Sequence, residues 1–171
     1  LASHNRPVAS LVYDIAGVVE KVLALFPHTA RIVMGGHSVG AQLAFKVQSI
    51  IRSPRITGLY LIAGVFDLSE LPGTVIGEPI GLTLEDAGEG TCRGDEFARG
   101  DVEVVLIVGD KETPKLRTQS AHMYDSLRSK GVKAQWKELP NEDHYSIMER
   151  FRMGDSKQMQ LLRQFCSVQA L

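Results

Sequence analysis

The sequence has no long hydrophobic run and very few cysteines. In its 171 residues no apolar stretch reaches the roughly 18 residues that a membrane-spanning helix needs, so we expect no membrane span. The two cysteines, Cys92 and Cys166, lie far apart and form no CxxC or metal-type spacing. Isolated cysteines of this kind are typical of reduced thiols rather than of a disulfide framework. We therefore expect a cytoplasmic protein, with the nucleus as a second compartment.

An excess of charge of either sign is also missing. Lys and Arg number 19 against 20 Asp and Glu, and the net charge is −1 at pH 7. No basic block interleaved with aromatic residues indicates binding to nucleic acid, so the expected partner is a small molecule. The N-terminal residues 1–7 carry no secretory signal pattern and no initiating Met, which favours a fragment or a processed product.

Strand-like and helix-like segments alternate along the chain. Short segments at 31–35, 102–108 and 132–139 are predicted to be strands, the last of them carrying Trp136. The continuous apolar run at 56–63 predicts a fully buried parallel strand. Helical spacing of apolar residues is found at 8–26, 39–52 and 115–130, and again after Asp155-Ser156. This alternation predicts an α/β fold, with a mostly parallel sheet of about four strands flanked by helices, in one domain over residues 1–171.

The connection over residues 69–100 differs from the rest of the chain. It is rich in Gly, Pro, Glu and Asp, and only residues 82–86 have the pattern of a helical turn or two. A connection of this length within a compact domain is usually functional or mobile. We therefore expect a lid-like or mobile insertion that follows the strand at 56–63.

A Gly-x-Ser-x-Gly pattern joins the first predicted strand to the next helix. Gly36 and Gly40 flank Ser38, which predicts the strand–turn–helix arrangement called a nucleophile elbow. Such a sharp turn strains the serine backbone, and we expect that neither glycine can carry a side chain. The turn also directs the N–H of Val39 and the positive end of the helix toward the place where an oxyanion would form.

A serine hydroxyl needs a base, and the base needs a carboxylate that fixes its tautomer. In α/β-hydrolases these groups follow in the order Ser, acid, His, each after a strand. His144 follows the fourth predicted strand and is the expected base. Glu112 and Asp110 both follow the third strand. We prefer Glu112, three residues after Gly109, because that position can turn back toward the histidine, and Asp110 remains the alternative acid.

Other histidines and acids are expected to serve no chemistry of their own. His37 lies inside the elbow and should pack beside the nucleophile. Glu142, Asp143 and His144 are adjacent in sequence, so they cannot easily converge on one ion, and no second histidine follows at ligand spacing. We expect neither a metal nor another cofactor.

Several segments together resemble kynurenine formamidase (arylformamidase). They are residues 36–44, 64–68, 82–87 and 104–109, the loop at Thr113-Pro114 with Arg117, Gln119 and Ser120 behind it, and the stretch 136–145. The resemblance implies an α/β-hydrolase that converts N-formyl-L-kynurenine to L-kynurenine and formate in tryptophan catabolism, without a metal or cofactor. It also implies that Ser38 is the nucleophile and His144 the base. Glu112 stands where the family usually has an aspartate.

The resemblance covers the C-terminal half to two-thirds of the family's fold. The family's His-Gly-Gly segment, which supplies further oxyanion donors, has no counterpart here, and neither do its first strands. A broad-specificity carboxylesterase and a truncated, non-catalytic homologue therefore remain as alternatives. The strand at 31–35 would keep an open edge, which allows a homodimer.

Overall fold

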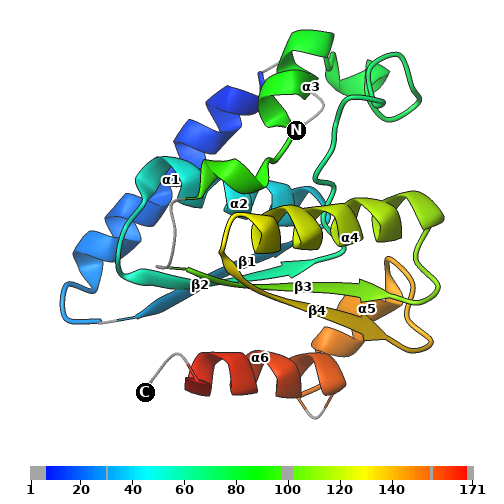
Figure 1. Ribbon diagram of the computed structural model, residues 1–171. Helices are drawn as coiled ribbons and strands as arrows, with labels where there is room; N and C mark the ends of the chain where they lie inside the picture. The colour runs from blue at the N-terminus through cyan, green and yellow to red at the C-terminus, as the bar shows by residue number, and fades with distance from the viewer. Residues whose placement is uncertain (1–6, 30, 98–101, 155, 169–171) are drawn as a thin grey trace.

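A four-stranded parallel sheet forms the centre of the molecule in the computed structural model (Figure 1). The structure describes residues 7–29, 31–97, 102–154 and 156–168. The strands β1 (Ile32–His37), β2 (Ile56–Ile62), β3 (Glu103–Gly109) and β4 (Lys133–Leu139) lie side by side in their order along the chain. Every neighbouring pair is parallel, so all four carboxyl ends meet at one edge of the sheet. The predicted α/β architecture is confirmed.

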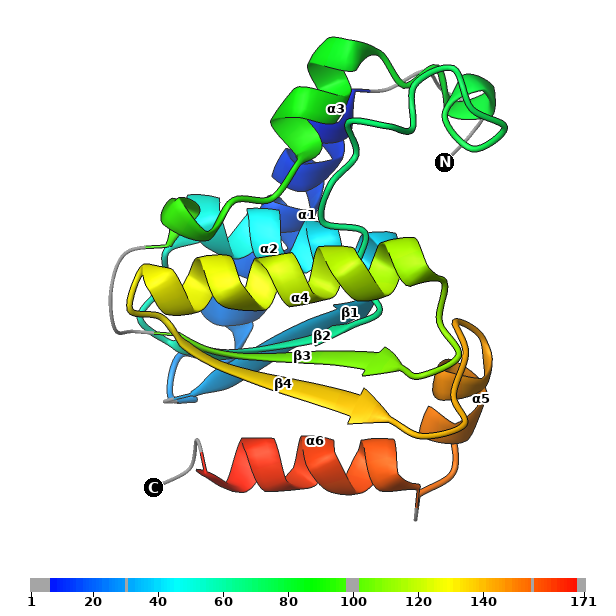
Figure 2. The ribbon, with the colours of Figure 1, turned by 45° about the vertical axis from the view of Figure 1, so that its right-hand side comes forward.

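Helices cover both faces of the sheet (Figure 2). One face carries α2 (Val39–Ile51) and α4 (Pro114–Ser129), with α1 (Val8–Leu25) packed on α2. The other face carries α6 (Lys157–Val168), and α5 (Ser146–Phe151) packs against α6. The sequence pattern gave no indication of α5. Asp155, expected near the start of the last helix, lies outside the described residues.

The side chains of β2 show how the sheet divides the core. Leu59 and Leu61 belong to the cluster beneath α2 and α4, whereas Tyr60 and Ile62 belong to the cluster that includes Phe165 of α6. All four β2 side chains are buried, because successive residues of a strand point to opposite faces and both faces are covered. This explains why β2 reads as an unbroken apolar run in the sequence.

The sheet leaves one side of β1 unpaired among the described residues, since β1 is the first strand in the sheet order. The helix α1, which packs on α2, buries only Val12 and Ala16. Several of its other apolar side chains are exposed, among them Tyr13, Val18 and Leu25. Part of the apolar surface of α1 therefore faces solvent.

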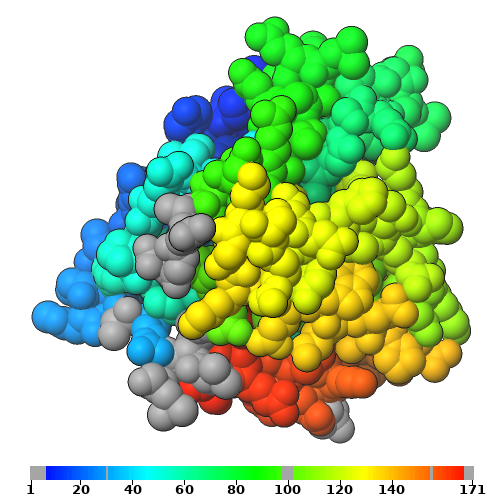
Figure 3. Space-filling view, in the orientation of Figure 1, coloured from blue at the N-terminus to red at the C-terminus, as the bar shows by residue number. Residues whose placement is uncertain are grey.

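The 69–100 connection contains more regular structure than the sequence indicated. Besides α3 (Leu84–Gly90) it includes the short 3₁₀ helices Glu78–Ile80 and Gly94–Glu96. Residues 98–100 of the predicted insertion lie outside the described residues. In the space-filling view the green part of this segment lies at the top of the molecule, above the yellow surface of α4 (Figure 3). Its role as a lid stays a prediction.

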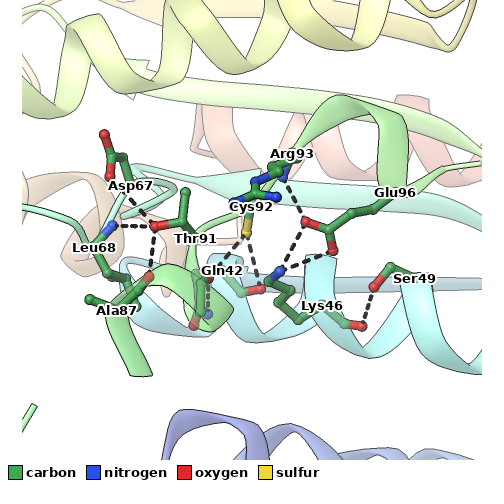
Figure 4. A network of polar contacts seen from close by, with 11 residues as sticks. Gln42, Lys46, Ser49, Asp67, Leu68, Ala87, Thr91, Cys92, Arg93 and Glu96 are labelled. Carbon is green, nitrogen blue, oxygen red and sulfur yellow. Dashed lines mark hydrogen bonds and ion pairs between the residues drawn. The ribbon is translucent and has the colours of Figure 1, made fainter. Parts of the chain in front are cut away.

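The far end of this connection is fastened to α2 by polar contacts (Figure 4). Gln42 Nε2 donates to the carbonyl of Gly90 over 2.8 Å, and Lys46 pairs with Glu96 at 2.9 Å. Thr91 Oγ1 accepts from the N–H of Leu68 at 3.1 Å, which links the two ends of the connection. Gln42 and Lys46 belong to α2, the helix that starts directly after Ser38. These contacts therefore hold α3 near the turn at Ser38.

Candidate active site

Ser38 forms the turn between β1 and α2 with a strained backbone. Its φ is 57° and its ψ is −122°, a combination that L-residues rarely adopt. The N–H of Ser38 donates to the carbonyl of Ile62 on β2 over 2.9 Å, and the carbonyl of Ser38 accepts from Ala41 at 3.1 Å. Neighbouring elements therefore fix this conformation, as the elbow pattern predicted.

The two flanking glycines serve the turn differently. A Cβ on Gly36 would lie 2.2 Å from the backbone C and O of Gly40, so no side chain fits there. A Cβ on Gly40 would meet nothing within 4 Å. The expectation that both positions exclude a side chain is therefore wrong for Gly40. The reason is geometric: the backbone of Gly40 approaches position 36, while its own Cβ direction is open.

Val39 is the first residue of α2, directly after the serine. The N–H groups in the first turn of a helix have no partner within the helix, and the helix dipole makes this end positive. An oxyanion beside Ser38 would meet both effects. The role of the Val39 N–H as a donor to that oxyanion stays a prediction.

Ser38, His144 and Glu112 lie together at the carboxyl edge of the sheet. His144 Nε2 is 3.1 Å from Ser38 Oγ, and His144 Nδ1 is 2.6 Å from Glu112 Oε2. An ionised carboxylate only accepts hydrogen bonds, so Nδ1 carries the proton and Nε2 offers its lone pair to the serine hydroxyl. This is the arrangement in which an imidazole can take a proton from a serine.

The structure separates the two candidate acids. Glu112 is buried, and its second oxygen, Oε1, accepts from the N–H of Thr113 over 2.7 Å. Both carboxylate oxygens of Glu112 are thus engaged. Asp110 has no hydrogen bond to His144 among the contacts of the described residues, and its buried Oδ1 has no partner there. Glu112 is therefore the carboxylate that meets the imidazole.

The loop after β3 and the loop after β4 are joined directly. The N–H of Lys111 donates to the carbonyl of Glu142 over 2.9 Å, and the N–H of Asp110 donates to Leu139 at 3.0 Å. The N–H of Glu112 closes a turn onto the carbonyl of Gly109 at 3.2 Å. These backbone bonds set how far the carboxylate stands from the imidazole.

Replacing Gly109 with alanine tests this loop junction. The new Cβ would lie 2.0 Å from the carbonyl oxygen of Glu142, so the two loops must move apart. We expect kcat to fall about 100-fold, because a displacement of about 1 Å in an active site has an effect of this size. Steady-state kinetics on the purified variant measure it.

The matched control is Gly17→Ala on α1, where a Cβ meets nothing within 4 Å. This control should keep its activity and gain up to about 1 kcal/mol of stability from the better helix propensity of alanine. An unchanged kcat in Gly109→Ala would show that the junction does not set the geometry.

Glu142 anchors the loop after β4 that carries His144, a role that the sequence did not reveal. Its buried carboxylate accepts from Ser146 Oγ at 2.6 Å and from Gln158 Nε2 at 3.0 Å, and it forms an ion pair with Arg150 Nε at 3.2 Å. Asp143 instead caps the start of α5, and hydrogen bonds from the N–H groups of Ser146 and Tyr145 lower its pKa. In the described ranges no group of three or more His, Cys, Asp or Glu side chains could hold a metal ion.

A cavity of about 770 Å³ opens from the serine and the histidine. This volume is in the range of about 300–1,000 Å³ that is typical of small-molecule sites. Its lining comes from α1, α2, α4 and the 65–82 segment, and most of these side chains are apolar, among them Leu11, Leu43, Leu68, Ile76, Ile80 and Leu116. The charged side chains Asp67, Glu70, Asp86 and Lys115 also reach the cavity, and Lys115 pairs with Glu70.

The ring of His37 packs beside His144 rather than only beside Ser38. Its ring centroid is 4.5 Å from that of His144, and its Nε2 is 2.9 Å from the main-chain oxygen of His144. Burial, followed by the charge of His144, lowers the pKa of His37 below its ordinary value. His37 is therefore neutral at pH 7.

The fold is that of the α/β-hydrolases. The chain superposes on a putative thioesterase from Silicibacter sp. with a TM-score of 0.73 at 18% identity, over 92% of this chain and 59% of the other. It superposes on the esterase Est22 with a TM-score of 0.73 at 18% identity, over 94% and 57% of the two chains. No family model matches the sequence.

In sequence the chain is similar to kynurenine formamidases, which confirms the resemblance found in its motifs. It is 29% identical to that of Salmo salar over 162 residues, 89% of this chain and 55% of the relative. It is 28% identical to that of Danio rerio, over 82% of this chain and 51% of the relative. The chain thus spans about half the length of the curated relatives that it matches.

In the described parts of the chain, no helix is both long and apolar enough to cross a bilayer.

Proposed function

We propose that this chain is a serine hydrolase of the kynurenine formamidase type, which converts N-formyl-L-kynurenine to L-kynurenine and formate. The observation that carries the proposal is the continuous hydrogen-bonded row of Ser38 Oγ, the His144 imidazole and the Glu112 carboxylate. The similarity to curated kynurenine formamidases over most of the chain supports the choice of substrate.

In the first half-reaction Ser38 Oγ attacks the formyl carbon while His144 Nε2 takes the hydroxyl proton. The carbonyl oxygen becomes an oxyanion, and the N–H of Val39 at the start of α2 donates to it. His144 then gives its proton to the aryl nitrogen, the C–N bond breaks, and kynurenine leaves. Glu112 holds the proton on Nδ1 and stabilises the imidazolium that forms between these steps.

In the second half-reaction a water molecule attacks the formyl-enzyme ester. His144 accepts one proton of this water and returns it to Ser38 Oγ as the ester bond breaks, so formate is released and the serine is restored. A formyl group contains a single carbon, so the acyl half of the substrate needs little room. The apolar cavity next to Ser38 would therefore hold the aromatic half.

The direct test is turnover of N-formyl-L-kynurenine by the purified chain. We expect equal amounts of kynurenine and formate, the first followed by its absorbance and the second by a formate dehydrogenase assay. A folded sample that releases neither product would contradict the proposed function. Labelling with a fluorophosphonate probe would then separate a hydrolase of other specificity, which is labelled at Ser38, from a non-catalytic homologue, which is not.

A second candidate is a carboxylesterase of broad specificity. The observation that favours this candidate is the largely apolar lining of the cavity, which would also accept the apolar part of an ester. The same three side chains would serve, with an alcohol in place of the amine as leaving group. A series of p-nitrophenyl esters of increasing acyl length, compared with N-formyl-L-kynurenine by kcat/KM, distinguishes the two: the proposed function requires the formamide to be preferred.

We also propose the cytoplasm or nucleus as the compartment, supported by the absence of a disulfide between the free thiols Cys92 and Cys166. One side of β1 pairs with no strand of the described ranges, and this supports association of two copies.

A further inference from the structure

A second histidine of the elbow contacts the loop that carries the base. His37 is the last residue of β1 and immediately precedes Ser38. Its Nε2 lies 2.9 Å from the main-chain oxygen of His144, a residue 107 positions later in the chain. A carbonyl oxygen only accepts hydrogen bonds, so the proton of this bond belongs to His37 Nε2. The strand end before the nucleophile thus holds the backbone of the base itself.

The main-chain oxygen of His144 accepts its hydrogen bond from His37. Among the hydrogen bonds of the described residues, no other donor reaches that oxygen. The N–H groups at the start of α5 bond instead to Asp143 and Tyr145, on either side of His144. Without His37, the peptide of the base would lose its tie to β1, and a partly buried acceptor would lose its partner.

We propose that His37 is a positioning residue for the hydrolytic reaction. By donating from Nε2 to the main-chain oxygen of His144, it holds the imidazole of His144 at the distance at which Nε2 can take the proton of Ser38. This proposal rests on the proposed function, because it assigns the contact to the same reacting pair.

The environment of His37 suits this role. The groups that face its ring are the His144 imidazole and, further away, the Glu112 carboxylate. His144 becomes positively charged during each half-reaction, and a second positive charge 4.5 Å away between ring centroids would oppose that step. A histidine that stays neutral keeps its Nε2–H donor and adds no repulsion. A permanently charged side chain such as lysine or arginine could not do both.

Two variants separate the hydrogen bond from the volume of the side chain. In His37→Gln the amide nitrogen can take the place of the imidazole Nε2 and still donate, whereas His37→Met has a similar length and no donor. We expect kcat to fall about 10- to 100-fold in His37→Met with KM within about twofold, since a small displacement of the base slows chemistry without changing substrate contacts. His37→Gln should recover kcat to within about threefold of the parent chain.

His122→Met is the matched control, because this histidine is exposed on α4 and does not belong to the loop that carries His144. It should leave kcat and KM unchanged. The proposal is overturned if His37→Met keeps the parent kcat, if His37→Gln is as slow as His37→Met, or if the loss falls in KM alone.

A second measurement does not depend on turnover. The proton on His144 Nδ1, which is shared with Glu112 over 2.6 Å, should give a resonance at low field in the proton NMR spectrum. We expect this resonance to persist in His37→Gln and to shift or broaden in His37→Met. An identical resonance in both variants would overturn the role of His37. If the parent chain turns over no substrate, the proposed function fails, yet this spectrum still decides for or against the positioning contact.

Discussion

Replacing Ser38 with alanine is expected to lower kcat by about 10⁴- to 10⁶-fold, the range found when the nucleophile of a serine hydrolase is removed. The residual rate would come from substrate binding and the oxyanion donor alone. His144 Nε2 contacts the serine hydroxyl at 3.1 Å. Alanine has no hydroxyl, so the variant has no nucleophile at this position. Formate release from N-formyl-L-kynurenine is the measurement.

Stability should change little in this variant. Alanine carries the same Cβ as serine, so it meets the backbone strain at φ 57° to the same extent. Ser129→Ala, which removes an exposed hydroxyl at the end of α4, is the matched control and should keep full activity. Turnover by a folded Ser38→Ala sample at more than a hundredth of the parent rate would remove Ser38 from the mechanism.

The second large effect is expected for Glu112→Gln. An amide nitrogen at this position would donate to His144 Nδ1, so the imidazole would carry its proton on Nε2 and could no longer accept the proton of Ser38. The same tautomer change in serine proteases lowers kcat about 10⁴-fold, and we expect a loss of about 10³- to 10⁴-fold here. The measurement is kcat with the same substrate.

Asp110→Asn is the internal comparison, because Asp110 is the other carboxylate of the same loop. Its Oδ1 has no partner among the described residues, so we expect kcat within about threefold of the parent chain. A large loss in Asp110→Asn combined with a small loss in Glu112→Gln would reverse the assignment of the acid.

The two central strands, β2 and β3, could be predicted from the sequence because both of their faces are buried. The predicted strand at 56–63 corresponds to β2 (Ile56–Ile62), whose side chains alternate between two covered faces and so appear as one apolar run. By contrast, α5 is six residues long and buries only Ile147, so it leaves almost no periodic signal. The short helices of the 69–100 connection are hidden for the same reason.

For the candidate site, the order of serine, carboxylate and histidine after successive strands was enough to select Ser38 and His144. The choice between Glu112 and Asp110 depended on a turn that the N–H of Glu112 closes onto Gly109. Composition cannot show which of two neighbouring carboxylates such a turn directs inward. The hydrogen bond from Gln158 to Glu142 could not be predicted from the sequence either, because only the folded chain brings these two side chains together.

The three side chains of the candidate site come from distant parts of the chain, which affects when the site forms during folding. Ser38 and His144 are 106 positions apart, and Glu112 and His144 are 32 apart, so the reacting groups depend on contacts of high sequence separation. Contacts of this kind carry a large loop-closure entropy and tend to form late in folding. Opening of the C-terminal loop after β4 alone would dismantle the site while the sheet stays intact. Partial unfolding of this loop would therefore remove catalytic activity before the sheet unfolds.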